Sequence, residues 1–249
     1  EEYLEKTGLT IVKDKRSFDR FRGRVMFPIH NFSGRVIGFG GRILKSDAKA
    51  AKYVNSPESD IYEKRKVLYG ICYAKKSIIS KDNCLLVEGY TDVISLHQAG
   101  IENVVSASGT SLTENQIRLI KRITSNVTIL FDGDAAGIKA SFRSIDLILE
   151  EGMNVKVVLF PEGADPDSYA KSVSPEELAS YIDENAKDFI SFKADLLMQE
   201  TAGDPVKIAG IIKDIIASVA VIPDAIVRSM YVRECSKVMD ISEQVLFAE

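Results

Sequence analysis

Between residues 84 and 160, short apolar runs alternate four times with longer stretches of helical periodicity. The apolar runs are too short for helices and have no polar face, which is the pattern of strands that helices cover on both sides. The strands are expected at residues 84–87, 103–107, 127–131 and 155–160, and the helices at 71–79, 93–99, 113–123 and 135–151. This alternation predicts a parallel sheet with flanking helices.

The segments before and after this alternation have different patterns. Residues 24–29 and 35–39 are extended runs separated by turn residues, and they predict a hairpin. From residue 174 onward the spacing of apolar residues is helical, and no strand is expected after Pro161. We therefore expect an α/β chain, α+β overall, with three domains: a mixed N-terminal lobe at 1–80, the sheet domain at 81–170 and a helical bundle at 171–249.

The net charge of −4 conceals a strong asymmetry along the chain. Residues 1–80 carry 17 Lys and Arg against 9 Asp and Glu, a net +8, whereas residues 81–249 carry 15 against 27, a net −12. Such a division fits either solvated surface or a cleft in which a basic wall faces an acidic floor. The three cysteines and two histidines form no zinc-type spacing, and no apolar run approaches the roughly 18 residues of a membrane helix. These features favour a cytoplasmic protein without zinc or membrane contact.

Acidic residues directly follow three of the predicted strands. They form three groups: Glu88 with Asp92, Asp132 with Asp134, and Asp165 with Asp167. Because the carboxyl ends of parallel strands meet at one edge of a sheet, we expect all three groups there. Taken singly, each group has a structural explanation, as acids at a helix N-terminus, a tight turn, or an N-cap before a proline.

Together, these carboxylates would repel one another strongly, and a hard divalent cation is the simplest remedy. Oxygen ligands without a neighbouring Cys or His favour Mg²⁺ or Mn²⁺ over zinc. Two such ions can stabilise the attacking and leaving oxygens of a phosphoryl displacement. The acidic groups therefore predict a metal site rather than three unrelated turns.

The residues around these acids resemble the Toprim module, which bacterial primases, topoisomerases and some nucleases share. The resemblance rests on three motifs: Glu88-Gly89-Tyr90-Thr91-Asp92, Asp132-Gly133-Asp134 and Asp165-Pro166-Asp167. Two basic segments narrow it further, Arg24-Val25-Met26-Phe27-Pro28-Ile29 and Lys52-Tyr53-Val54-Asn55-Ser56-Pro57. They look like the RNA-polymerase core of the bacterial DnaG-type primases, and the match is dense over about residues 16–170.

The resemblance implies a role for each group of residues. Glu88, Asp132 and Asp134 match the family's catalytic and metal-binding acids, Asp165 and Asp167 match a third acidic motif that supports a further ion, and Asp92 matches a neighbouring acid. The basic residues that match the template- and nucleotide-binding set are Arg20, Arg22, Arg24, Lys52 and Lys64. The three arginines alternate, so on a strand they would point to one face. Tyr53 is a candidate to stack on a base or simply a packed aromatic, and Asn55 is a candidate to contact the incoming nucleotide.

The implied function is that of a DNA primase, which synthesises short RNA primers on single-stranded DNA from ribonucleoside triphosphates and uses two or more Mg²⁺ or Mn²⁺ ions. Its product is an RNA–DNA duplex. Family members begin with a zinc-binding domain and end with a helicase-binding domain, and neither is recognisable here. The replicative helicase is therefore expected to bind through a domain that this chain lacks.

Two alternatives stay open. A Toprim hydrolase, either a nuclease or a topoisomerase, would use the same acids but leave the segment 52–55 without a role. A non-catalytic clamp for single strands would explain the basic residues but leave the carboxylates unneutralised. Incubation with template, ribonucleotides and Mn²⁺ separates the three, since it yields primers, shortened template or binding alone.

Overall fold

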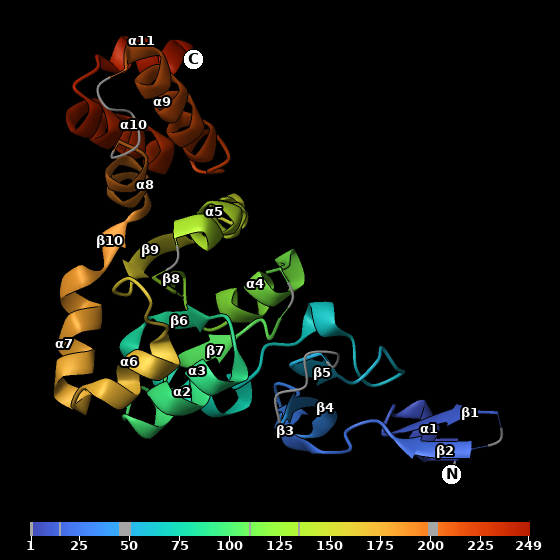
Figure 1. Ribbon diagram of the computed structural model, residues 1–249. Helices are drawn as coiled ribbons and strands as arrows, with labels where there is room; N and C mark the ends of the chain where they lie inside the picture. The colour runs from blue at the N-terminus through green and yellow to red at the C-terminus, as the bar shows by residue number, and fades with distance from the viewer. Residues whose placement is uncertain (1, 15, 45–50, 110, 134, 199–203) are drawn as a thin grey trace.

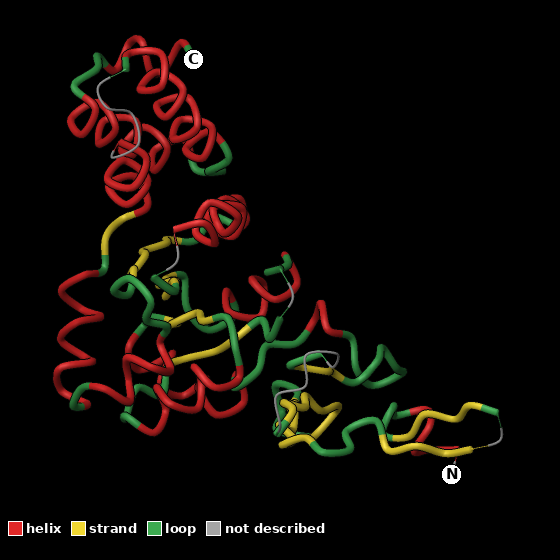
Figure 2. Tube along the Cα trace, viewed as in Figure 1, coloured by secondary structure: helices red, strands yellow, loops and turns green. Residues whose placement is uncertain are grey.

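The computed structural model describes residues 2–14, 16–44, 51–109, 111–133, 135–198 and 204–249. Figure 1 shows three parts along a bent molecule: a mostly stranded N-terminal lobe, a central sheet with helices, and a group of C-terminal helices at the opposite end. The secondary-structure view in Figure 2 separates the same parts by the distribution of strands and helices.

The N-terminal lobe contains two small antiparallel sheets. Its elements are helix α1 (Glu2–Lys6), strands β1 (Thr10–Lys13), β2 (Arg16–Asp19), β3 (Arg24–His30), β4 (Val36–Ile43) and β5 (Tyr53–Asn55), and the 3₁₀ turn η1 (Lys64–Lys66). β1 pairs with β2, and β3, β4 and β5 form the second sheet in that order. The predicted hairpin is confirmed, because β3 and β4 pair antiparallel across the turn at residues 31–35.

The central part is the alternating α/β domain that the sequence predicts. Its elements are α2 (Ile71–Lys81), β6 (Cys84–Val87), α3 (Tyr90–Gln98), β7 (Val104–Ser106), α4 (Glu114–Lys121), β8 (Asn126–Phe131), α5 (Ala135–Glu150) and β9 (Asn154–Leu159). Strands β6 to β9 are parallel, in the spatial order β9-β8-β6-β7. Helix α3 begins at Tyr90, three residues before the predicted start, because Asp92 caps it by accepting a hydrogen bond from the Gly89 amide.

Alternate residues of each strand face opposite layers of helices. On one face, Leu86 and Ile129 belong to the core that includes α2, α4 and α5. On the other, Leu85 and Leu130 pack with α3 and with the helices that follow β9. Both faces are therefore buried, which explains why the strands read as unbroken apolar runs.

The chain after β9 is helical apart from one short strand, and its first two helices cover the central sheet while the later ones form the group at the opposite end (Figure 1). Its elements are α6 (Pro166–Ser172), α7 (Pro175–Asn185), β10 (Lys187–Asp188), α8 (Phe189–Met198), α9 (Pro205–Ala220), α10 (Ala225–Met239) and α11 (Glu243–Ala248). The expectation of no strand after Pro161 is wrong, since β10 pairs antiparallel with β9 at the edge of the main sheet. Two residues carry no periodicity, and only the backbone hydrogen bonds to β9 define this strand.

A buried lysine joins the C-terminal helices to the central domain. Lys193 on α8 is 2% exposed, donates a hydrogen bond to Ser218 Oγ of α9, and lies 3.4 Å from Asp146 Oδ1 of α5. Its ammonium also lies 4.9 Å from the centre of the Phe142 ring. Burial lowers the pKa of Lys193, and the nearby Asp146 partly offsets this effect. The charge therefore holds three helices together rather than facing solvent.

No helix within the described residues is long and apolar enough to span a lipid bilayer.

Candidate active site

The register of the parallel strands brings the acidic residues to one edge of the sheet. Leu86 of β6 is paired with Ile129 of β8, so Glu88 lies level with the end of β8, where Asp132 follows. Strand β9 runs alongside β8, and the Gly133 amide donates to the Ala164 carbonyl oxygen at 2.9 Å. This bond holds the turn after β8 against the segment that leads into Asp165.

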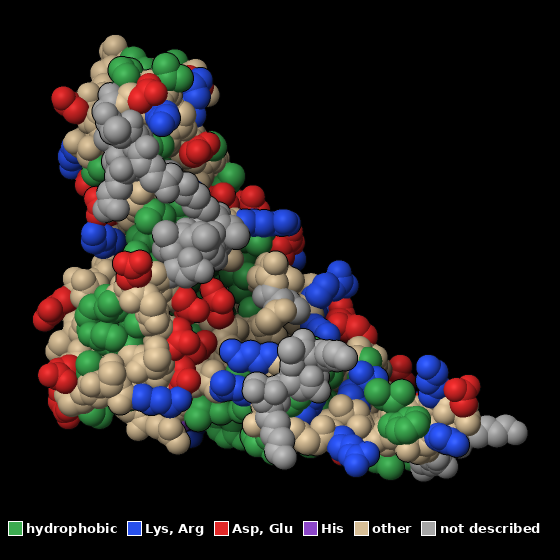
Figure 3. Space-filling view, in the orientation of Figure 1, with side chains coloured by type: hydrophobic (Ala, Val, Ile, Leu, Met, Phe, Trp, Pro, Cys, Tyr) green, Lys and Arg blue, Asp and Glu red, His purple; other side chains and the backbone are tan. Residues whose placement is uncertain are grey.

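A cavity of about 360 Å³ lies where this edge meets the N-terminal lobe. Four carboxylates from the sheet edge line it: Glu88, Asp92, Asp132 and Asp165. From the N-terminal lobe, Tyr53 and Asn55 of β5 and the preceding residue, Lys52, line it as well. In the space-filling view of Figure 3, acidic side chains gather in the middle of the molecule with basic side chains directly beside them. The charge asymmetry along the chain is thus a real juxtaposition in space.

Glu88 and Asp132 differ in their exposure to solvent. The Glu88 side chain is exposed and, among the described residues, its carboxylate has no hydrogen bond or ion pair. Asp132 is half-buried, and its Oδ1 is shielded from solvent. Asp134, the second acid of this motif, lies outside the described residues.

Asp92 also lines this cavity, although it is largely buried, and it caps its own helix. Its Oδ2 accepts a 2.8 Å hydrogen bond from the Gly89 amide, and the residue is 6% exposed. Burial is the largest cause that raises the pKa of Asp92 from its ordinary value of 3.8 to about 6, and the charges of Asp165, Asp167 and Glu88 raise it further. The mutual repulsion expected among these carboxylates is therefore present in the metal-free protein.

Asp92→Asn is expected to stabilise the metal-free protein above pH 6. A carboxyl group whose pKa rises on folding binds its proton more tightly in the folded state. The contribution of Asp92 to the free energy of unfolding is therefore most favourable below about pH 4 and is lost as the pH rises through about 6. Asparagine keeps an oxygen for the Gly89 amide but has no charge. The variant should match the wild type at pH 4 and gain about 2–3 kcal/mol at pH 8. Denaturant unfolding at both pH values checks this, and equal curves at pH 8 would contradict it.

Asp165 and Asp167 also have structural roles. Asp165 is the N-cap of α6, and its Oδ1 accepts a 2.6 Å hydrogen bond from the Ser168 amide. Asp167 does not line the cavity in this structure; its Oδ1 accepts from Ser95 Oγ and pairs with Lys171 Nζ at 2.6 Å. Partial burial raises the pKa of Asp167, but the hydrogen bonds from Lys171 and Ser95 outweigh it and hold the pKa below its ordinary value.

The predicted common face of three arginines is not formed. Residues 20–23 are a turn between β2 and β3, and only Arg24 is on a strand, so the expected alternation is wrong. The Asp19 side chain accepts a hydrogen bond from the Phe21 amide at 2.8 Å, and Gly23 has a φ of 71°, both of which favour a turn. Arg20 and Arg24 donate to the backbone carbonyl oxygens of Gly8 and Gly41, whereas Arg22 is exposed.

The remaining basic and aromatic candidates lie at different places. The Lys52 ammonium and the Arg42 guanidinium lie 6.0 and 5.7 Å from the centre of the half-buried Tyr53 ring. That ring packs against a buried cluster that includes Phe27 and Tyr90. Lys64 is on η1 and lines a small neighbouring hollow with Ser108, outside the acidic cavity. Arg42 was not among the predicted residues, although its charge reaches Asp167 and lowers the pKa of that carboxyl. The sequence feature that could have marked Arg42 as a candidate site residue is its position directly after Gly40-Gly41.

The side chains that line the acidic cavity are of the chemical type that binds a hard divalent cation. The acidic cavity is lined by carboxylates and by neither Cys nor His, and oxygen ligands of this type are those of Mg²⁺ and Mn²⁺. Within the part of the chain that the structure describes, no three His, Cys, Asp or Glu side chains are close enough to hold one ion together. The arrangement therefore supplies the ligand chemistry but not a complete coordination shell among those residues.

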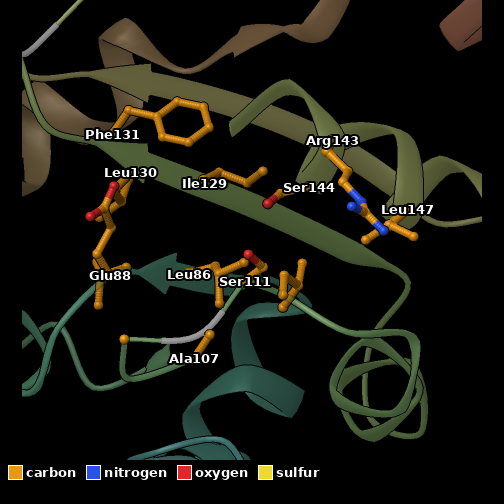
Figure 4. A pocket seen from close by; sticks show the side chains of 13 residues that line it. Leu86, Glu88, Ala107, Ser111, Ile129, Leu130, Phe131, Arg143, Ser144 and Leu147 are labelled. Carbon is orange, nitrogen blue, oxygen red and sulfur yellow. The ribbon is translucent and has the colours of Figure 1, made fainter. Parts of the chain in front are cut away.

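A second cavity of about 320 Å³ adjoins the same edge. Apolar residues of β6 and β8, including Leu86 and Ile129, form its wall, and Glu88 lies at one end with Arg143 of α5 at the other (Figure 4). Glu88 and Gly109 belong to the lining of both cavities. No sequence pattern predicts this space, because its walls are ordinary core residues.

Comparison with known proteins identifies three consecutive matches to families. A family model for the N-terminal domain of the DNA primase catalytic core matches residues 1–75, a Toprim-like model matches 85–170, and a model for the DnaB-helicase binding domain of primase matches 194–244. The expectation that no helicase-binding region is present is therefore wrong. The helical tail has the periodicity of any small bundle, so its pattern alone did not reveal this match.

Sequence and structure relatives agree with these matches. A DNA primase of Clostridium acetobutylicum is 38% identical over 98% of this chain, and the chain spans 40% of the length of that relative. A DNA primase domain from Pseudomonas aeruginosa superimposes with a TM-score of 0.87 and 32% identity over 99% of this chain and 78% of its own. A DnaG primase catalytic domain bound to ssDNA gives a TM-score of 0.81 at 35% identity, over 95% of this chain and 77% of its own.

The central domain is of the Toprim type, because its parallel sheet presents Glu88 after one strand and Asp132 after the neighbouring strand, at the same carboxyl edge. A basic lobe precedes this domain, and primase-specific matches lie on both sides of it. The chain therefore belongs to the DnaG family of DNA primases. The family implies the use of divalent metal.

Proposed function

We propose that this chain carries the site at which a DNA primase joins ribonucleotides on a single-stranded DNA template. The observation that carries the proposal is the shared cavity, in which Lys52 and Tyr53 of the basic lobe face Glu88, Asp132 and Asp165 of the sheet edge. Basic side chains are needed to bind the triphosphate, and carboxylates are needed to hold metal ions beside the phosphate that reacts. Both are available within one cavity.

Each group of residues has a distinct role in this proposal. Lys52 and Arg22 hold phosphate groups of the template or nucleotide through charge, without reading sequence. Tyr53 and Asn55, which line the cavity, would contact the base and sugar of the nucleotide. Glu88, Asp132 and Asp134 would hold Mg²⁺ or Mn²⁺, with Asp165 and Asp167 near a further ion. The bound metal would supply charge neutralisation at the reacting phosphate.

The wider assignments belong to the same proposal. The basic lobe at 1–80, the metal-binding domain at 81–170 and the helical bundle at 171–249 would act as three units, with an RNA–DNA duplex as product. The match of residues 194–244 supports contact between the C-terminal helices and a replicative helicase. The ssDNA in the relative's structure supports single-stranded DNA as template.

The test is a priming assay with single-stranded template, ribonucleoside triphosphates and Mn²⁺. Short RNA products made only in the presence of template and metal are expected. Shortened template without RNA product would indicate a nuclease instead, and binding without either product would indicate a clamp. Either result would overturn the proposal.

Lys52→Ala and Arg22→Ala are expected to weaken single-strand binding for all template sequences. Removing one interaction with a phosphate should reduce the slope of log affinity against log salt by about 0.7. The matched control is Lys81→Ala, which removes an exposed lysine near the amino ends of the strands, away from the acidic edge. Binding isotherms at several salt concentrations provide the measurement. A slope unchanged in both test variants, or reduced as much in the control, would show that these residues do not contact the template.

A further inference from the structure

A continuous chain of hydrogen bonds connects the basic lobe to the backbone of Glu88. The Tyr90 hydroxyl donates to Asn55 Oδ1 at 2.9 Å, and Asn55 Nδ2 donates to the Ser108 carbonyl oxygen at 3.2 Å. The Ser108 amide donates to Ser106 Oγ at 2.8 Å, and that hydroxyl donates to the Glu88 carbonyl oxygen at 2.7 Å. The chain thus passes from β5 through the segment after β7 to the carboxyl end of β6.

The first link is fixed by an aromatic cluster. The Tyr90 ring stacks on Phe27 at 5.1 Å with an interplanar angle of 5°, and Tyr69 meets it edge-on at 4.6 Å. Gly40 of β4 lies so close that an added Cβ would be 2.6 Å from the Tyr90 ring. Tyr90 is 2% exposed, so the cluster fixes its ring between the N-terminal lobe and the central domain. In this position the hydroxyl group points toward Asn55.

The last links are held in an unusual backbone conformation. Ser108 has a φ of 56°, a region that residues other than glycine rarely adopt without a local reason. The hydrogen bond from its amide to Ser106 Oγ supports this conformation, and Ser106 is completely buried. Ser108 also lines the acidic cavity beside Asn55 and Glu88. A strained residue that is tied in place at a cavity wall is typical of a functional site.

We propose that this chain of hydrogen bonds is a positioning device that sets the distance between the nucleotide-binding wall and the acidic edge, with Tyr90, Asn55 and Ser106 as positioning residues. Asn55 retains one amide hydrogen and one lone pair beyond these bonds, so it can hold a nucleotide while it is itself held. The inference rests on the proposed function, because it assigns these residues to the same site.

The experiment compares Tyr90→Phe with a matched control, Tyr69→Phe. Both keep their rings in the same cluster, but the Tyr69 hydroxyl has no hydrogen bond among the described residues, whereas the Tyr90 hydroxyl is the first link. Tyr90→Phe should raise the KM for ribonucleotides and their Kd about threefold to tenfold, the range that corresponds to one neutral hydrogen bond. The kcat and the salt slope for template should stay near wild type, and the melting temperature should fall by no more than about 2–4 °C, because the lost hydrogen bond also belongs to the free protein.

A double-mutant cycle with Asn55→Ala provides the decisive readout. If the hydroxyl acts through Asn55, Tyr90→Phe should add nothing in the Asn55→Ala background, because the link is already broken. Ser106→Ala tests the chain of hydrogen bonds from its other end and should raise the same KM. With a merely structural role, Tyr90→Phe would leave the KM and Kd for ribonucleotides unchanged, and that result would overturn the inference. So would an undiminished effect of Tyr90→Phe in the double variant.

Failure of this inference can be told apart from failure of the proposed function. If the wild type makes no primers, the proposed function falls, and the positioning role is judged on the Kd of ribonucleotide with Mn²⁺. A wild type that binds no ribonucleotide would overturn both. If the wild type primes and Tyr90→Phe equals it in KM and Kd, only the positioning role falls.

Discussion

Asp132→Asn is expected to reduce primer synthesis by about a hundredfold to a thousandfold, the range seen when one group that stabilises a transition state is removed. Asp132 directly follows β8 and lines the cavity shared with Lys52. Asparagine has nearly the same shape and keeps one oxygen, so the fold should survive. One of the negative charges that would hold a divalent cation is lost.

Thermal melts give an independent readout of the same substitution. A ligand that binds only the folded state stabilises it by about 2.7 kcal/mol at a hundredfold excess over its Kd. Mn²⁺ should therefore raise the melting temperature of the wild type, and Asp132→Asn should lose most of that increase. Asp183→Asn, an exposed acid of α7 that lines a different cavity at the amino ends of the strands, is the control and should respond as the wild type does.

Glu88→Gln separates two roles for the glutamate. If Glu88 is mainly a metal ligand, both Mn²⁺ stabilisation and synthesis should fall. If it is mainly an acid or base, stabilisation should persist while synthesis is lost. A wild-type protein whose melting does not respond to Mn²⁺ would contradict the metal site altogether, and the acids would then be explained by capping and turns alone.

Gly133→Ala is expected to destabilise the protein by about 3 kcal/mol, at the upper end of the usual cost of overpacking. A Cβ at this position would lie 2.0 Å from the Pro161 carbonyl oxygen and 2.9 Å from that of Phe160. These are backbone atoms of the segment directly after β9, so the contact cannot be relieved by a side-chain rotation. The turn that carries Asp132 must shift, and primer synthesis should fall with stability.

The control for this substitution is Gly210→Ala in helix α9. Apart from the neighbouring residues and the backbone of the helix itself, no atom lies within 4 Å of a Cβ at that position. Glycine disfavours a helix by about 0.8–1.0 kcal/mol relative to alanine. Gly210→Ala should therefore stabilise the protein, so the two Gly-to-Ala changes have opposite signs. Urea unfolding of both variants checks this. A neutral Gly133→Ala would mean that the turns after β8 and β9 are farther apart than the structure has them.

The central sheet is predictable from the sequence because its signals are local. An unbroken apolar run such as 84–87 has no polar side for solvent, so it predicts a strand covered on both faces, and the structure buries all four residues. The helix expected from residue 113 likewise begins with a capping box at Thr113. Parallel strands then place Glu88, Asp132 and Asp165 at one edge without further information. These features follow from side-chain burial and backbone hydrogen bonding, which the spacing of residues already encodes.

The way in which the lobes meet depends on contacts between distant parts of the chain. Arg20 and Arg22 alternate as residues of a strand would, but they lie in a turn. The Asp19 side chain accepts a hydrogen bond from the Phe21 amide there, and Gly23 adopts a positive φ. Strand β10 exists only through its pairing with β9, and Asn55 reaches Ser108 across 53 positions of sequence. Such contacts depend on which surfaces come together in space, so the spacing of neighbouring residues in the sequence does not predict them. Local residue patterns are therefore enough to establish the acidic edge, whereas the packing of the N-terminal lobe against that edge sets the shape of the site.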